Sequence, residues 1–131
     1  MKYVLDTNTV IYFFKGMGNV ANQLRTHHPS QVAIPAVVLY ELNVGILKSD
    51  NPTKRISQLK ILLEQVAVLP FTQEEADIAA KIRVDLEKKG TPIGAYDILI
   101  AAAALSHQAT LVSHNTKEFS RINGLNLVDW F

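Results

Sequence analysis

Short β-prone runs alternate with helical patterns along nearly the whole 131-residue chain. The first run, Tyr3–Leu5, stops at a polar Asp-Thr-Asn turn that predicts the start of a short helix. Val32–Ile34 predicts a second strand, and Pro35 suits the first turn of a helix that runs to about Leu47. Strands that alternate with helices in this way favour an α/β domain with a mainly parallel sheet. In such sheets, sites form at the carboxyl ends of the strands.

The alternation continues to the end of the chain. Thr72 and Glu75 have the spacing of a capping box that opens a long helix, and Gly90 ends it. A chain of this length suits one compact core, so we expect a single domain over residues 1–131. The later predicted elements are a helix over Ile56–Glu64, a strand over Val66–Phe71, the helix from Thr72 to Gly90, a helix over Tyr96–His107, a strand over Thr110–Ser113, a helical turn over Thr116–Arg121 and a strand over Leu125–Val128.

Composition excludes several classes of protein. The chain has no cysteine, which rules out disulfide scaffolds, thiolate zinc sites, iron–sulfur ligation and cysteine nucleophiles. Its longest apolar run, Ile98–Leu105, is too short to span a membrane, which takes about 20 residues. Asp6 lies too near the N-terminus for a signal peptide. We therefore expect a cytoplasmic protein without a membrane segment.

Three acids lie where an ordinary structural role does not explain all of them. Asp6 ends the first predicted strand, where an aspartate also serves as a helix N-cap. Glu41 falls between Val37 and Val44 on the apolar stripe of its helix, and glutamate is rarely buried without a partner. Asp97 lies in the first turn of a very apolar helix, expected to be the most buried in the chain, where the helix dipole favours an acid. Capping explains one such acid, but not three.

Two further polar residues follow the fourth predicted strand. Asn115 and Glu118 have nearly the spacing of a capping box, and that alone accounts for either of them. They could also reach a site at the end of that strand.

Carboxylates that converge at one sheet edge repel one another unless a cation holds them. Oxygen ligands without cysteine or paired histidine favour Mg²⁺ or Mn²⁺ over zinc. Ions held by few carboxylates are often shared with phosphate groups, where they activate water for an in-line displacement. Phosphate chemistry is therefore the leading class of function.

The net charge supports this interpretation once it is divided by position. The chain carries thirteen Lys and Arg against twelve Asp and Glu, a formal +1. Setting aside Asp6, Glu41, Asp97 and Glu118 leaves eight acids against thirteen basic residues, a formal +5. A basic surface around an acidic pocket suits a polyanionic substrate.

The ordered motifs resemble a PIN domain, and most closely the VapC toxins of bacterial toxin–antitoxin modules. The resemblance runs from Tyr3 to Trp130 and depends on four matching stretches. These are Val4-Leu5-Asp6-Thr7-Asn8, then Glu41, then Ile93-Gly94-Ala95-Tyr96-Asp97-Ile98-Leu99-Ile100-Ala101, and finally Leu111-Val112-Ser113-His114-Asn115-Thr116-Lys117-Glu118-Phe119.

The resemblance implies a three-layer α/β/α fold with about five strands and a metal-dependent endoribonuclease activity. A small VapB-type antitoxin would inhibit it, a homodimer is usual, and the antitoxin would carry the assembly to operator DNA. Asp6, Glu41 and Asp97 match the three acidic positions that hold Mg²⁺ or Mn²⁺. The form of the last motif is similar to the enterobacterial toxins, whose target is initiator tRNA.

The remaining site residues follow from the same resemblance. Asn115 replaces a fourth aspartate, which leaves the number of metal ions open, and Glu118 matches the acid just beyond it. We count both with the three acids as catalytic candidates. Thr7 and Asn8 would position water or phosphate, or only cap a helix.

Other readings fit the sequence less well. Gly16-x-Gly18-x-x-Ala21 imitates a dinucleotide-binding loop, but the preceding strand ends ten residues too early. A haloacid-dehalogenase-like enzyme needs aspartate where Asn8 stands. A response-regulator receiver needs one where Pro70-Phe71-Thr72 follows the third strand. One alternative stays open, namely a PIN-fold module that binds RNA or a protein without cutting.

Overall fold

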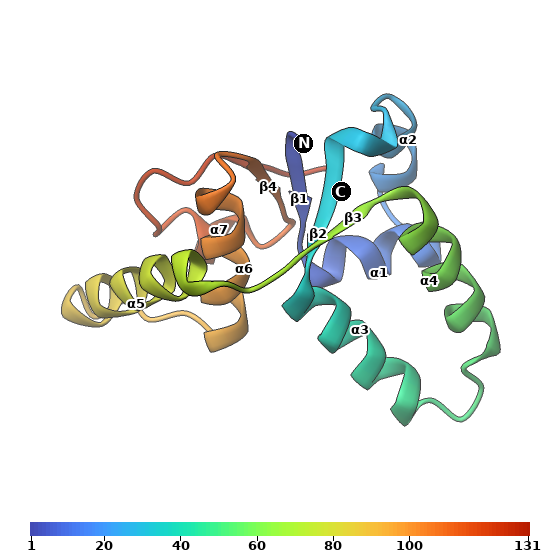
Figure 1. The fold of residues 1–131 in the computed structure, drawn as a ribbon, viewed down its shortest axis with the longest axis horizontal. Coiled ribbons are helices and arrows are strands. Elements are labelled where there is room, and N and C mark those ends of the chain that lie inside the picture. The colour runs from blue at the N-terminus through green and yellow to red at the C-terminus, as the bar shows by residue number, and fades with distance from the viewer.

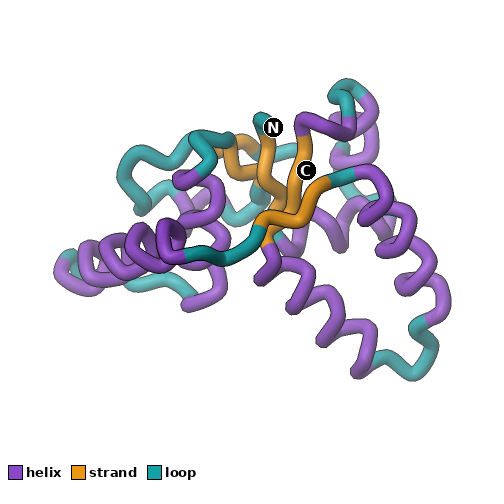
Figure 2. Tube along the Cα trace, in the orientation of Figure 1, coloured by secondary structure: helices purple, strands orange, loops and turns teal.

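The computed structural model describes residues 1–131 and has one five-stranded parallel sheet with helices around it (Figures 1 and 2). The strands are β1 (Tyr3–Leu5), β2 (Val32–Pro35), β3 (Ala67–Leu69), β4 (Thr110–Val112) and β5 (Leu127–Val128). The helices are α1 (Thr7–Lys15), α2 (Val20–Arg25), α3 (Ala36–Lys48), α4 (Thr53–Gln65), α5 (Gln73–Lys88), α6 (Ala95–Ser106) and α7 (Thr116–Phe119), with a 3₁₀ turn over Pro29–Gln31. The predicted α/β class with a mainly parallel sheet is confirmed.

The strand order β3-β2-β1-β4-β5 places β1 in the middle of the sheet. The chain builds outward from β1 through β2 and β3, then returns to the other side for β4 and β5. The carboxyl ends of β1 and β4 therefore lie at the point where the strand order reverses, the usual place for a binding crevice in an open α/β sheet. Leu5 pairs with Val112, so the next residues, Asp6 and Ser113, emerge side by side.

Helices cover the sheet on both sides. Figure 1 shows α5, α6 and α7 on one side of the strands and α1 to α4 on the other. Helix α6 is the most enclosed helix, as predicted, because Ala101, Ala102 and Ala104 are fully buried and their small side chains let it pack tightly. The buried apolar side chains form one cluster of 28 residues. No helix has both the length and the apolar character that crossing a bilayer requires.

Prolines shift two predicted boundaries. The third strand, predicted over Val66–Phe71, covers only Ala67–Leu69, because Pro70 has no N–H with which to continue the ladder. Pro35 ends β2 in an extended conformation and is the N-cap of α3, so its predicted place in the first helical turn is wrong.

Some local features differ from the sequence prediction. The capping box at Thr72 and Glu75 is wrong in its usual form, because the Thr72 hydroxyl donates to the Glu75 carboxylate (2.8 Å) and caps no helix amide. Helix α2 was not predicted, because Val20 is its only buried residue and so no apolar stripe marks it. Gly16 is not part of a phosphate loop: it ends α1 in the left-handed conformation (φ 67°).

Candidate active site

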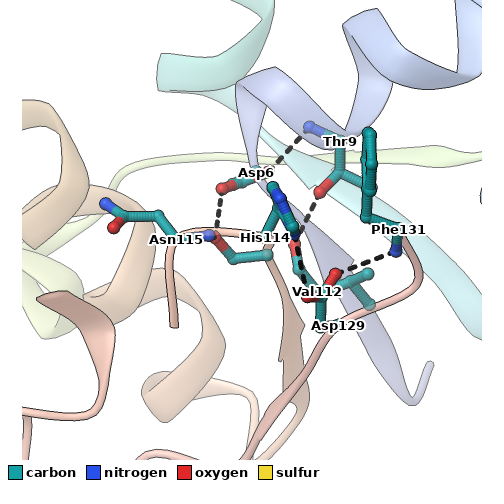
Figure 3. A network of polar contacts seen from close by, with 8 residues as sticks. Asp6, Thr9, Val112, His114, Asn115, Asp129 and Phe131 are labelled. Carbon is teal, nitrogen blue, oxygen red and sulfur yellow. Dashed lines mark hydrogen bonds and ion pairs between the residues drawn. The ribbon is translucent and has the colours of Figure 1, made fainter. Parts of the chain in front are cut away.

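Asp6 leaves the end of β1 and is nearly buried, with 5% of its surface exposed. One carboxylate oxygen, Oδ1, accepts the Thr9 backbone N–H at 2.9 Å and so caps α1. The other oxygen, Oδ2, accepts the Ser113 hydroxyl at 2.6 Å (Figure 3). The predicted cap is confirmed, and the remaining oxygen ties the same side chain to the end of β4.

Ser113 is the site residue that the sequence interpretation missed. Its fully buried hydroxyl donates to Asp6 and accepts the Asn115 backbone N–H at 3.0 Å. Beside it, the Thr9 hydroxyl donates to the Val112 carbonyl at 3.1 Å, which ties α1 to β4 (Figure 3). A serine directly after a strand, in register with an acid directly after the neighbouring strand, is the signal that could have identified Ser113.

Glu41 lies on α3 and is partly buried, as its place on the apolar stripe predicted. The Thr7 hydroxyl donates to Glu41 Oε1 at 2.7 Å, so the start of α1 holds this carboxylate. Asn8 is exposed, and its side chain makes no hydrogen bond within the chain.

Asp97 lies in the first turn of α6, and the other acids affect its pKa. Burial, the largest cause, and nearby negative charges together raise the pKa of the Asp97 carboxyl from its ordinary 3.8 to about 6. In descending order, these charges belong to Asp6, Glu118 and Glu41. Carboxylates from three other parts of the chain therefore act on Asp97 at the carboxyl edge of the sheet.

The chain provides no cation to neutralise this cluster. Its three ion pairs all lie elsewhere and join Arg83 to Glu87, Lys89 to Asp85, and His114 to Asp129. A group of carboxylates held together without a counter-charge costs stability, which is a feature of functional sites.

Asn115 and Glu118 flank the cluster from the end of β4 and from α7. Asn115 stands at the N-cap position of α7, but its side chain caps no amide, so the capping interpretation is wrong for it. Its backbone departs from the extended conformation of a typical N-cap (ψ 59°), and its amide group extends away from Asp6 (Figure 3). Glu118 is partly buried, and its negative charge contributes to the raised pKa of Asp97.

The donor set suits a hard divalent cation. No three His, Cys, Asp or Glu side chains converge closely enough to hold one ion directly. Mg²⁺ usually binds through one or two carboxylates and keeps several waters, so the carboxylates of Asp6, Asp97 and Glu41 fit that mode better than a closed cage.

A groove lies between α1, α3 and α4. It has a volume of about 240 Å³, and Glu41 is the only acid among its lining residues. Its walls are mostly apolar, with Arg55 as the only basic residue. The lining residues are Ile11, Phe14, Glu41, Leu42, Gly45, Ile46, Ser49 and Arg55.

Comparisons with known proteins agree with this geometry. The PIN domain family model matches residues 3–125. The tRNA(fMet)-specific endonuclease VapC of Salmonella typhimurium is 33% identical over 130 residues, which cover 99% of this chain and 98% of that protein. Ribonuclease VapC2 of Rickettsia felis is 37% identical over 132 residues, with the same coverage.

Solved structures show the same fold. The DNA-bound VapBC of Salmonella typhimurium aligns with a TM-score of 0.93 and 32% identity, covering 100% of this chain and 99% of that one. VapBC2 of Rickettsia felis, bound to a DNA fragment from its promoter, aligns with a TM-score of 0.90 and 35% identity over the full length of both chains. The motifs, the parallel sheet and the relatives agree: this chain belongs to the PIN-domain family, among the VapC ribonucleases of toxin–antitoxin systems.

Proposed function

We propose that the protein is a toxin that cleaves RNA phosphodiester bonds with the help of Mg²⁺ or Mn²⁺. The observation that carries this proposal is the cluster of four carboxylates without a counter-charge at the carboxyl edge of the sheet. Asp6, Glu41 and Asp97 would hold the ion partly through its bound waters, because no three acidic side chains converge closely enough to bind it directly. Asn115 would stand beside them as an uncharged candidate. When bound, the ion supplies an activated water and a positive charge near the phosphate.

The surrounding residues prepare the carboxylates for this task. Ser113 and the Thr9 amide fix both oxygens of Asp6, and Thr7 orients Glu41. Asp97 has a pKa of about 6, so at neutral pH it is mostly ionised and able to bind a cation. Glu118 adds negative charge that an ion would relieve.

A basic side chain lies near the start of α6. Arg121 donates to the Pro92 carbonyl at 3.1 Å, in the loop that leads to Asp97. One guanidinium nitrogen is thereby fixed while other N–H groups remain available for a phosphate. Arg121 is therefore our first candidate among the basic residues for contact with the RNA backbone.

The proposed substrate is tRNA, with initiator tRNA as the specific target. Two observations support this choice, the Asn-Thr-Lys-Glu-Phe form of the last motif and the relative named as a tRNA(fMet)-specific endonuclease. Glu118 and Asn115 belong to that motif and lie at the acidic cluster.

The proposed partner is a small VapB-type antitoxin, through which a dimeric toxin would reach operator DNA. Both related structures described above are VapBC assemblies bound to DNA. The apolar groove is the proposed binding site for an antitoxin segment. Such a segment would contact Glu41 and cover the acids.

The nuclease proposal is tested on protein purified free of antitoxin. We expect it to cut initiator tRNA in Mg²⁺ or Mn²⁺, to stop in chelator, and to leave elongator methionine tRNA largely intact. Cleavage that continues unchanged in chelator would contradict the metal role. Absence of both cleavage and Mn²⁺ binding would favour the non-catalytic binding module.

The proposed antitoxin-binding site is tested at Gly45, where an added Cβ meets no atom within 4 Å. Gly45→Phe should fill the groove and weaken antitoxin binding while leaving cleavage intact. Gly45→Ala is the matched control and should bind as the wild type does. Equal antitoxin affinity for both variants would contradict antitoxin binding in this groove.

A further inference from the structure

Two exposed tyrosines stand directly beside the acidic cluster. Tyr40 precedes Glu41 on α3, and Tyr96 precedes Asp97 on α6, and these two helices pack against each other. The rings meet edge to face, with centroids 5.6 Å apart, and the two hydroxyls lie 3.2 Å from each other in a hydrogen bond. The pair therefore bridges the two helices that carry Glu41 and Asp97.

The other two tyrosines of the chain are placed differently. Tyr3 packs against His27 and Trp130, and Tyr12 packs against His114 and Phe131. Tyr40 and Tyr96 have no aromatic neighbour except each other, and they leave 50% and 46% of their surfaces exposed. Core packing explains Tyr3 and Tyr12 but does not explain this pair.

The electrostatics of the pair indicate what it can contact. The two hydroxyls are uncharged phenol groups that already pair with each other at 3.2 Å. The neighbouring carboxylates repel phosphate groups, except where a cation shields them. The neutral part of a nucleotide is its base, and bases stack on aromatic side chains because every base has a π-face.

We infer that Tyr40 and Tyr96 form a stacking platform for an unpaired base of the RNA, next to the phosphate that is cut. This inference rests on the proposed ribonuclease function and adds a substrate-positioning role at the same site. It requires that the bases next to the cut phosphate be unpaired, because a base inside a helix presents no free face.

A kinetic test combines substitutions in the protein and in the RNA. The cut site in initiator tRNA is mapped first, and an abasic nucleotide is then placed on either side of it. Removing the base that stacks should lower wild-type kcat/KM by roughly 5- to 150-fold, as should Tyr96→Ala on the intact RNA. Combining the two changes should add little further loss. Full additivity of the two losses would overturn the inference.

Two conservative variants separate stacking from other roles. Tyr96→Phe keeps the ring and should cleave almost as the wild type does, whereas Tyr96→Leu keeps apolar bulk but has no aromatic face and should resemble Tyr96→Ala. Equal activity of the Phe and Leu variants would contradict stacking. A change of oligomeric state or of antitoxin affinity in Tyr96→Ala, with cleavage unchanged, would identify the pair as a protein interface instead.

A binding test works even if the proposed nuclease function is wrong. Asp97→Asn protein is mixed with short single-stranded RNAs that carry one 2-aminopurine each. Stacking should quench the fluorescence at one position, and Tyr40→Ala with Tyr96→Ala in the same background should remove the quenching. Quenching by Asp97→Asn, together with a wild type that cuts no RNA, would refute the nuclease and leave the platform. Absence of quenching with an RNA that the wild type cuts would refute the platform alone.

Discussion

Asp97 and Asp129 have the same side chain, and the fold shifts their pKa values in opposite directions. Burial and three neighbouring acids raise the pKa of Asp97 to about 6. Burial also pushes the pKa of Asp129 upward, but the Phe131 N–H (2.8 Å) and the His114 ring (2.9 Å) outweigh it, and the result lies below the ordinary value.

The difference is the one expected between a proposed functional site and a contact that stabilises the fold. Asp129 is supplied with donors from the chain itself, and its ionised form stabilises the C-terminal segment. The groups that affect Asp97 are other acids, so its ionised form costs stability in the absence of a cation. The contrast predicts that removing the two charges has opposite consequences.

The largest expected effect comes from Asp97→Asn. Losing one carboxylate of the proposed metal site should lower RNA cleavage by at least about 100-fold. The same change should raise the free energy of unfolding at neutral pH by up to about 2 kcal/mol once solvent screening is allowed for, because repulsion is removed. Gel assays and thermal melting measure both quantities. A variant that is inactive because it is unfolded would contradict this account.

Next in size is Ser113→Ala, which removes the hydroxyl between Asp6 and Asn115. A buried carboxylate oxygen loses its donor, so unfolding should become easier by about 1 to 3 kcal/mol. Cleavage should fall by roughly 10- to 100-fold, because Asp6 is no longer held in place. Ser120→Ala is the matched control, since that hydroxyl donates to the Lys117 carbonyl on an exposed turn and should change neither quantity.

Stability should depend on pH through Asp97 with an unusual sign. The folded chain keeps the Asp97 proton up to about pH 6, whereas the unfolded chain releases it near 3.8, so the folded state binds more protons between these values. The free energy of unfolding should therefore rise by about 1 kcal/mol when pH is lowered from about 7.5 to about 5. Asp97→Asn should lack this contribution, which is seen by subtracting its melting profile from that of the wild type.

The smallest expected effect is that of Asp129→Asn. Its pKa is lowered in the folded state, so its contribution is present above pH 3.8 and is lost as pH falls below that value. Losing this exposed pair should cost about 0.5 to 1 kcal/mol at neutral pH, with RNA cleavage unchanged. A loss of cleavage at intact stability would show that Asp129 contributes to activity and would contradict the contrast with Asp97.

The sequence was sufficient where a local pattern decides the structure. The strand at Tyr3–Leu5, the apolar helix that carries Asp97 and the break at Gly90 all follow from propensity and periodicity over neighbouring residues. The position of Glu41 could be predicted for the same reason, since an acid on an apolar stripe requires an explanation.

The sequence was insufficient where distant segments meet. Ser113 donates to a residue 107 positions away, and only the pairing of β1 with β4 brings the two together. The sequence presented the helix cap and the site as alternative roles for Asp6. The structure allows both, because its two carboxylate oxygens have different partners. The Tyr40–Tyr96 pair likewise depends on the packing of α3 against α6.

The central claim is that the fold holds Asp6, Glu41 and Asp97 together for a divalent cation. Calorimetric titration of Mn²⁺ into the antitoxin-free protein at about pH 7.5, where Asp97 is ionised, tests it most directly. The account predicts saturable binding by the wild type, binding at least tenfold weaker in Asp97→Asn, and unchanged binding in Asp129→Asn. No binding by the wild type, or equal binding by the wild type and Asp97→Asn, would contradict it.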